Sequence, residues 1–65
     1  MPVIEIKMTS GKPPDKVKEM IKQIHNVVKD TLEVPEDVVT VIVDDSYDLD
    51  KWSIGGQLCS EIKDS

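Results

Sequence analysis

The chain opens with Met1-Pro2-Val3-Ile4-Glu5-Ile6-Lys7-Met8, in which a proline runs directly into an alternating, β-branched pattern. From position 3 onward, Ile4, Ile6 and Met8 share one face and the intervening residues share the other. A period of two predicts a half-buried strand over about residues 3–8. A lone strand is not stable, so the rest of the chain must supply a neighbouring strand and a cover for the apolar face.

Pro2 has two interpretations on its position alone. Initiator methionine is generally removed when proline stands second, and we expect the mature chain to begin with the secondary amine of Pro2. Apolar neighbours disfavour the ammonium form and lower the pKa of such an amine, which yields a base near neutral pH. Alternatively, Pro2 is only a rigid first residue of the strand, where its missing N–H costs nothing.

A long helix and a second strand are predicted next. Pro14 suits the first turn of a helix, and Asp15 suits its positive end. The helix is predicted over about residues 14–32, because apolar residues recur at steps of three, four and seven: Val17, Met20, Ile21, Ile24, Val27, Val28 and Leu32. Pro35 stops it. The β-branched run at about residues 38–43 predicts a strand covered on both faces, parallel to the first and reached by a right-handed crossover.

The remainder is predicted to be an irregular acidic loop followed by a small hairpin. Residues 44–51 superficially resemble a calcium loop, but Leu49 and Gly55 stand where such a loop needs glycine and glutamate, so we expect no metal. The hairpin and tail are predicted at about residues 52–62, with Gly55 and Gly56 in the turn. Leu58 and Ile62 are four residues apart, which would suit one helical turn.

The composition limits the class of protein. A chain of 65 residues is a single domain, 1–65, and it buries too little surface to be stable alone. One cysteine and the lack of a His/Cys cluster leave oligomerisation as the source of stability. A net charge of −5 with no arginine argues against a nucleic-acid partner. With no leader and no apolar run near the roughly 20 residues that span a bilayer, we expect a cytoplasmic protein with no membrane partner.

Four features in order resemble the 4-oxalocrotonate tautomerase family: Pro2-Val3-Ile4-Glu5-Ile6, the long helix, Val39-Thr40-Val41-Ile42-Val43, and Ser53-Ile54-Gly55-Gly56-Gln57-Leu58 after an aromatic residue. The resemblance covers nearly the whole chain. It implies an α+β fold, in which a β-α-β subunit with two parallel strands, one long helix and a short C-terminal hairpin associates into four-stranded sheets. It also implies a homohexamer, a trimer of dimers, that uses Pro2 as a general base without a cofactor.

The site residues that the resemblance implies match only in part. Family members bind the substrate's carboxylate and carbonyl oxygens with two arginines and close the pocket with an aromatic side chain. Trp52 matches the aromatic position, whereas Lys12 stands where the first arginine is expected and Thr40 where the second is. A lysine cannot form the bidentate fork of a guanidinium, and threonine carries no charge. Lys51 could supply a further polar contact, from this subunit or from its neighbour.

Two other reactive residues are assigned to the scaffold. His25 lies in the middle of the predicted helix with no Ser or Cys at a suggestive spacing, which indicates a boundary or surface histidine. Cys59 has no activating base or electropositive setting in the sequence, which favours a buried packing role.

The expected function is keto–enol tautomerisation of a small 2-oxo or 2-hydroxy unsaturated carboxylic acid by a cofactor-independent isomerase. Two alternatives stay open. One is a hydratase or dehalogenase-type reaction, in which Asp48 or Asp50 assists a protonated proline. The other is a non-catalytic subunit of a mixed oligomer, in which another chain brings the arginines.

Overall fold

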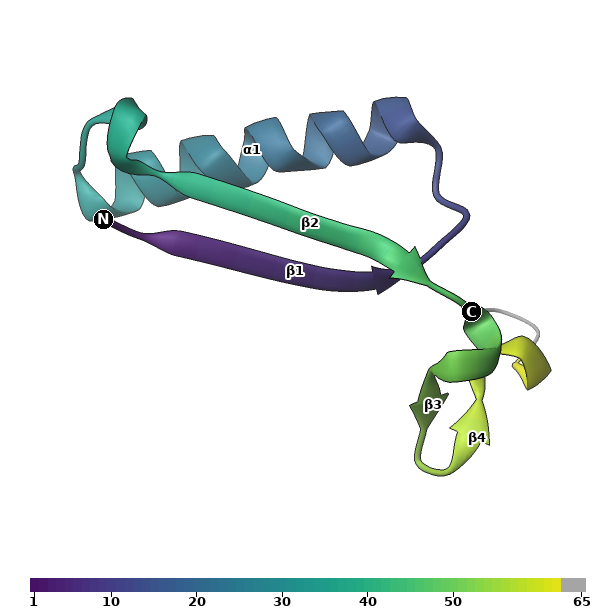
Figure 1. Ribbon diagram of the computed structural model, residues 1–65. Coiled ribbons are helices and arrows are strands. Elements are labelled where there is room, and N and C mark those ends of the chain that lie inside the picture. The colour runs from purple at the N-terminus through teal and green to yellow at the C-terminus, as the bar shows by residue number, and fades with distance from the viewer. Residues whose placement is uncertain (63–65) are drawn as a thin grey trace.

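The computed structural model describes residues 1–62 and has a β-α-β core with a small C-terminal hairpin (Figure 1). In chain order the helices and strands are β1 (Val3–Thr9), α1 (Pro14–Leu32), β2 (Thr40–Tyr47), β3 (Ser53–Ile54) and β4 (Gln57–Leu58). β1 and β2 are parallel neighbours joined through α1, and β3 and β4 form a separate antiparallel pair. The predicted α+β fold is therefore confirmed for the subunit, while its association into four-stranded sheets stays a prediction.

The helix α1 occupies the range that the apolar spacing predicts. Pro14 stands at its first position, where a missing N–H is tolerated. Asp15 lies in the first turn, where a negative charge is favoured. The helix ends at Leu32 and is capped by Glu33, whose backbone is left-handed with φ 55° and whose N–H donates to the carbonyl of Lys29. This left-handed residue turns the chain back toward the start of β2.

The two strands pair in a register that gives the sheet two different faces. Ile4 lies opposite Val41 and Ile6 opposite Val43, and all four side chains are half-buried on the side of α1. The other face carries the exposed residues Val3, Glu5 and Lys7 of β1 and Thr40, Ile42 and Asp44 of β2. The alternation predicted for the first strand is thus the alternation observed, and one helix covers only one face of the sheet.

The strand predicted at residues 38–43 is wrong at its start. Residues Glu36–Val38 form a 3₁₀ turn after Pro35, and β2 begins only at Thr40. The N–H groups of Val38 and Val39 donate to the carbonyls of Pro35 and Glu36 at 3.3 and 3.4 Å. A turn that uses these N–H groups locally leaves them unavailable for strand pairing, whatever the β propensity of valine.

The same prediction is wrong at its end, because the acidic residues continue the strand instead of leaving it. The register passes from Lys7 opposite Asp44 to Thr9 opposite Tyr47, so β2 carries one more residue than β1 across a bulge. The Asp44 carboxylate accepts hydrogen bonds from the hydroxyl of Ser46 at 2.6 Å and from its N–H at 3.1 Å. These bonds stabilise the bulge and hold the pKa of Asp44 below its ordinary value of 3.8.

The C-terminal unit is organised around one aromatic pair and one buried thiol. The rings of Tyr47 and Trp52 meet edge to face with centroids 5.4 Å apart, and the carbonyl of Trp52 accepts a hydrogen bond from the N–H of Cys59 at 2.8 Å. Gly55 and Gly56 both have positive φ, 60° and 86°, as a two-residue hairpin turn of type I′ requires. Leu58 is followed by a 3₁₀ turn at Cys59–Glu61, where the single helical turn was expected.

Burial is low for a folded chain. Within residues 1–62, Cys59 is the one hydrophobic residue that is fully buried, at 3% exposure. The accessible surface is 5090 Å², against about 4200 Å² expected for a compact monomer of 7.3 kDa. Large apolar side chains remain exposed: Met1, Val3, Val27, Leu32, Ile42 and Ile54. In the part of the chain described, no helix has the length and apolar character needed to cross a membrane.

Candidate functional site

Pro2 directly precedes β1, at one end of the two-stranded sheet. Its side chain is half-buried, and its carbonyl accepts a hydrogen bond from the N–H of Thr40 at 3.1 Å. Met1 projects from it with 93% of its surface exposed. While Met1 is attached, the Pro2 nitrogen is a tertiary amide without basicity, whereas removal of so exposed a residue would free the amine at little cost to packing.

Of the other predicted site residues, only Thr40 lies at the same end of the subunit as Pro2. It opens β2 directly opposite Val3, and its side chain is exposed on the sheet face away from α1. Pro2 and Thr40 are therefore brought together by strand pairing across a gap of 38 positions in sequence. The hydroxyl of Thr40 can donate or accept a hydrogen bond, but it supplies no positive charge.

Lys12 lies at the opposite end of the sheet. It stands in the loop between β1 and α1, and the seven residues of β1 separate it from Pro2 by more than roughly 20 Å at about 3.3 Å per residue. There it borders a largely apolar hollow of about 380 Å³ lined by Met8, Lys12, Pro13, Lys16, Val17 and Met20. Lys16 borders the same hollow. The helical pattern places Lys16 only on the polar side of α1, so the sequence did not predict it as a site residue.

Trp52 and Lys51 also lie away from Pro2. Lys51 is exposed at the end of the 3₁₀ turn Leu49–Lys51, and half-buried Trp52 follows it. Figure 1 shows this C-terminal unit beyond the end of β2 that is distal to the amino terminus, in a molecule whose longest extent is 42 Å. Within one subunit, Pro2 and Thr40 therefore cannot share a small substrate with Lys12, Lys51 and Trp52.

The two aspartates considered for a hydration reaction differ in their roles. The carboxylate of Asp48 accepts the N–H of Asp50 at 2.9 Å and so caps the 3₁₀ turn that carries Lys51. Asp50 is exposed. Like Lys51 and Trp52, both aspartates lie away from the Pro2 of the same subunit, so the hydratase or dehalogenase-type alternative requires an aspartate from another chain.

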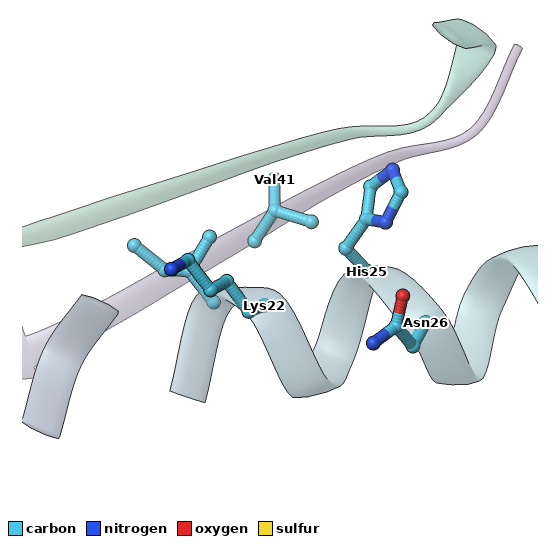
Figure 2. Close-up of a pocket in the computed structure, with 5 residues that line it drawn as sticks. Lys22, His25, Asn26 and Val41 are labelled. Atoms are coloured by element: carbon cyan, nitrogen blue, oxygen red, sulfur yellow. The ribbon is translucent and has the colours of Figure 1, made fainter. Parts of the chain in front are cut away.

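A second hollow, of about 460 Å³, is lined by none of the predicted site residues. Figure 2 shows it between α1 and the strands, lined by Ile21, Lys22, His25, Asn26 and Val41. His25 is half-buried here, and its Nε2 atom lies 3.0 Å from the carbonyl oxygen of Glu36. The sequence-based interpretation of His25 as a boundary residue agrees with this exposure, but the long-range hydrogen bond has no signal in the sequence.

Comparisons with known proteins agree on one family. A family model described as tautomerase enzyme matches residues 2–62. A solved 4-oxalocrotonate tautomerase homologue is 30% identical with a TM-score of 0.82, over 94% of this chain and 95% of that chain. TomN, a 4-oxalocrotonate tautomerase homologue in the tomaymycin biosynthetic pathway, is 26% identical with a TM-score of 0.87, over 98% and 97%.

A further likeness concerns the fold alone. A heterohexamer 4-oxalocrotonate tautomerase from Chloroflexus aurantiacus is 21% identical with a TM-score of 0.88, over 97% of this chain and 100% of that chain. No curated protein matches the sequence. Because the family model spans nearly all of the described chain and the solved relatives share its β-α-β fold, the protein belongs to the 4-oxalocrotonate tautomerase family of the tautomerase superfamily.

Proposed function

We propose that the protein is a cofactor-independent keto–enol tautomerase that uses the amine of Pro2 as its general base. The observation that carries this proposal is the setting of Pro2: half-buried, fixed to β2 through its carbonyl, and preceded by a fully projecting Met1. Partial desolvation favours the neutral amine, which is the form that accepts a proton. The substrate class is a small 2-oxo or 2-hydroxy unsaturated acid.

The proposed reaction is a proton shuttle. The neutral Pro2 amine takes a proton from the hydroxyl or α-carbon of the substrate, and a cationic side chain stabilises the oxygen on which negative charge develops. The resulting ammonium then returns a proton to another carbon. Lys12 is the proposed cation, with Lys51, Thr40 and Trp52 as further substrate contacts.

This assignment requires association of subunits. Lys12 and Trp52 of one chain lie too far from its own Pro2, so they must meet the Pro2 of another chain. A homohexamer built as a trimer of dimers is the proposed assembly, and the exposed apolar residues of the single subunit support association.

The test compares the wild-type chain and Pro2→Ala, both with Met1 removed as verified by mass spectrometry. Ketonisation of phenylenolpyruvate is the assay, and Pro2→Ala is expected to lower kcat by about 10²-fold or more while light scattering finds the same assembly. A matched control is wild-type protein that retains Met1, which is expected to be inactive. Equal activity of the three preparations would refute a proline base.

A second candidate is a non-catalytic subunit of a mixed oligomer. It is favoured by the absence of arginine from the sequence and by the existence of a heterohexamer with this fold. The chain purified alone, with Met1 removed, distinguishes the two. A well-assembled particle that lacks ketonisation activity would favour the mixed oligomer, whereas turnover by the isolated chain would exclude it.

A further inference from the structure

Within residues 1–62, His25 makes the one side-chain hydrogen bond that joins α1 to the segment leading into β2. A carbonyl oxygen can only accept, so Nε2 must carry a proton and donate to the oxygen of Glu36. Nε2 donates in the neutral ring with this tautomer and in the charged ring alike. Figure 2 shows the ring rising from α1 toward the strands, close to Val41.

The turn that receives this bond is weakly held by its own backbone. Its two internal hydrogen bonds measure 3.3 Å, from Val38 to Pro35, and 3.4 Å, from Val39 to Glu36. Both lie beyond the usual 2.7–3.2 Å range, whereas the bond from His25 lies within it at 3.0 Å. The Glu36 carbonyl thus takes its better hydrogen bond from the helix, 11 residues away in sequence.

The same turn leads within two residues to the partner of Pro2. Val38 ends the turn, and Thr40 then donates its N–H to the carbonyl of Pro2 at 3.1 Å. Figure 1 shows the amino terminus, the end of α1 and this turn together at one end of the molecule. A continuous set of contacts therefore runs from His25 through the Glu36–Val38 turn and Thr40 to Pro2.

We infer that His25 is a positioning residue for the Pro2 amine, an inference that rests on the proposed function. By tethering the Glu36–Val38 turn to α1, it fixes the start of β2 and with it the strand end that carries Pro2. Proton transfer is sensitive to placement, and a displacement of about 1 Å can cost up to roughly 10²-fold in rate. His25 itself does not contact the substrate.

Two variants separate the hydrogen bond from the bulk of the ring. In His25→Gln, the side-chain nitrogen reaches about as far as Nε2 and can still donate to Glu36. In His25→Asn, an equally polar amide falls short, at about the place of Nδ1. A third variant, Val28→Ala, destabilises α1 at a half-buried position without removing the hydrogen bond from His25 to Glu36, and it controls for general loss of stability.

The expected result is a kcat about tenfold lower in His25→Asn with KM nearly unchanged, and recovery to within about twofold of wild type in His25→Gln. Faster hydrogen exchange at the Thr40 amide is expected in His25→Asn alone. Two results would overturn the inference: His25→Asn with wild-type kcat and wild-type Thr40 exchange, or equal losses in His25→Asn and Val28→Ala at matched stability.

A substrate-free measurement keeps the inference separable from the proposed function. The chemical shift of ¹⁵N-labelled Pro2 reports the surroundings of its amine, and it is expected to move in His25→Asn and to return in His25→Gln. If wild type with free Pro2 lacks tautomerase activity, the proposed function fails. Independently of activity, a Pro2 resonance that does not move in His25→Asn would reject the positioning role.

Discussion

At the scale of single residues, the site is short of positive charge. Lys12 is the proposed cation, and Lys16 borders the same hollow, while the one ion pair in the described chain joins Lys29 and Asp30. Both lysines are exposed and have no ion-pair partner within residues 1–62. They are therefore available to a carboxylate, although without the fixed fork of a guanidinium.

Replacement of Lys12 by glutamine is expected to raise KM for a carboxylate substrate roughly tenfold. A charge-assisted hydrogen bond contributes about 1.5–3 kcal/mol, and about 1.4 kcal/mol corresponds to one factor of ten. Lys18→Gln is the control, because Lys18 is an exposed lysine of α1 that does not border the hollow. Equal KM values for the two variants in steady-state assays would remove Lys12 from the site.

Asp44 supplies a prediction for pH. Hydrogen bonds from the hydroxyl and then the N–H of Ser46 lower the pKa of Asp44 in the folded state below 3.8. The carboxylate form therefore contributes stability above pH 3.8, and this contribution is lost as the pH falls through the lowered folded-state pKa. Asp44 is fully exposed, so the effect on stability is small.

The check is an NMR titration of the Asp44 carboxyl in wild type and in Ser46→Ala. The midpoint is expected below 3.8 in wild type and closer to 3.8 in the variant. A midpoint that does not move in Ser46→Ala would assign the shift to the Ser46 N–H, which the variant keeps, or to Lys7 and Tyr47.

At the scale of secondary-structure elements, the end of α1 stores backbone strain. Glu33 has φ 55° and is the one residue other than glycine with positive φ in residues 1–62. The left-handed conformation costs an L-residue about 1–2 kcal/mol, which glycine avoids.

Glu33→Gly is accordingly expected to raise the free energy of unfolding by about 0.5–1 kcal/mol, after allowance for the greater freedom of glycine in the unfolded chain. Lys18→Gly, in the interior of α1, is the matched control and is expected to lower it by about 1 kcal/mol. Urea unfolding followed by circular dichroism, at one fixed protein concentration, measures both. Destabilisation by Glu33→Gly would mean that the glutamate side chain has a role at this helix end that outweighs the strain.

At the scale of the whole molecule, the subunit has almost no fully buried core: within residues 1–62, Cys59 is the one hydrophobic residue that is fully buried. One helix covers one face of a two-stranded sheet, and Ile42 is 49% exposed on the other face. Two strands with an open face are marginal in water, so association is expected to supply the missing burial.

Ile42→Glu is expected to weaken assembly at least about 100-fold, because its carboxylate lies directly opposite that of Glu5 and an unpaired charge in a buried interface costs several kcal/mol. Gln57→Glu adds the same charge at an exposed position of the hairpin and is expected to leave assembly unchanged. Light scattering and circular dichroism across dilution measure both. A wild-type chain that stays a folded monomer, with full helical signal at micromolar concentration, would contradict this view of the core.

The sequence by itself determined those secondary-structure elements whose pattern lies within a short stretch of the chain. The three- and four-residue spacing of apolar side chains, with Pro14 at its start and Pro35 after it, is sufficient to predict α1. The alternation after Pro2 and the glycine pair before Gln57 are similarly sufficient for β1 and the hairpin. These patterns follow from the repeat geometry of each element, which does not depend on distant residues.

Only the tertiary structure decided how the site residues lie relative to one another. A rigid strand of seven residues separates Pro2 from Lys12, and pairing with β2 brings Thr40 to Pro2 instead. The start of β2, the bulge at Asp44 and the bond from His25 to Glu36 likewise depend on contacts between segments far apart in sequence. Strand register and side-chain reach across the fold are long-range properties, and no local period encodes them.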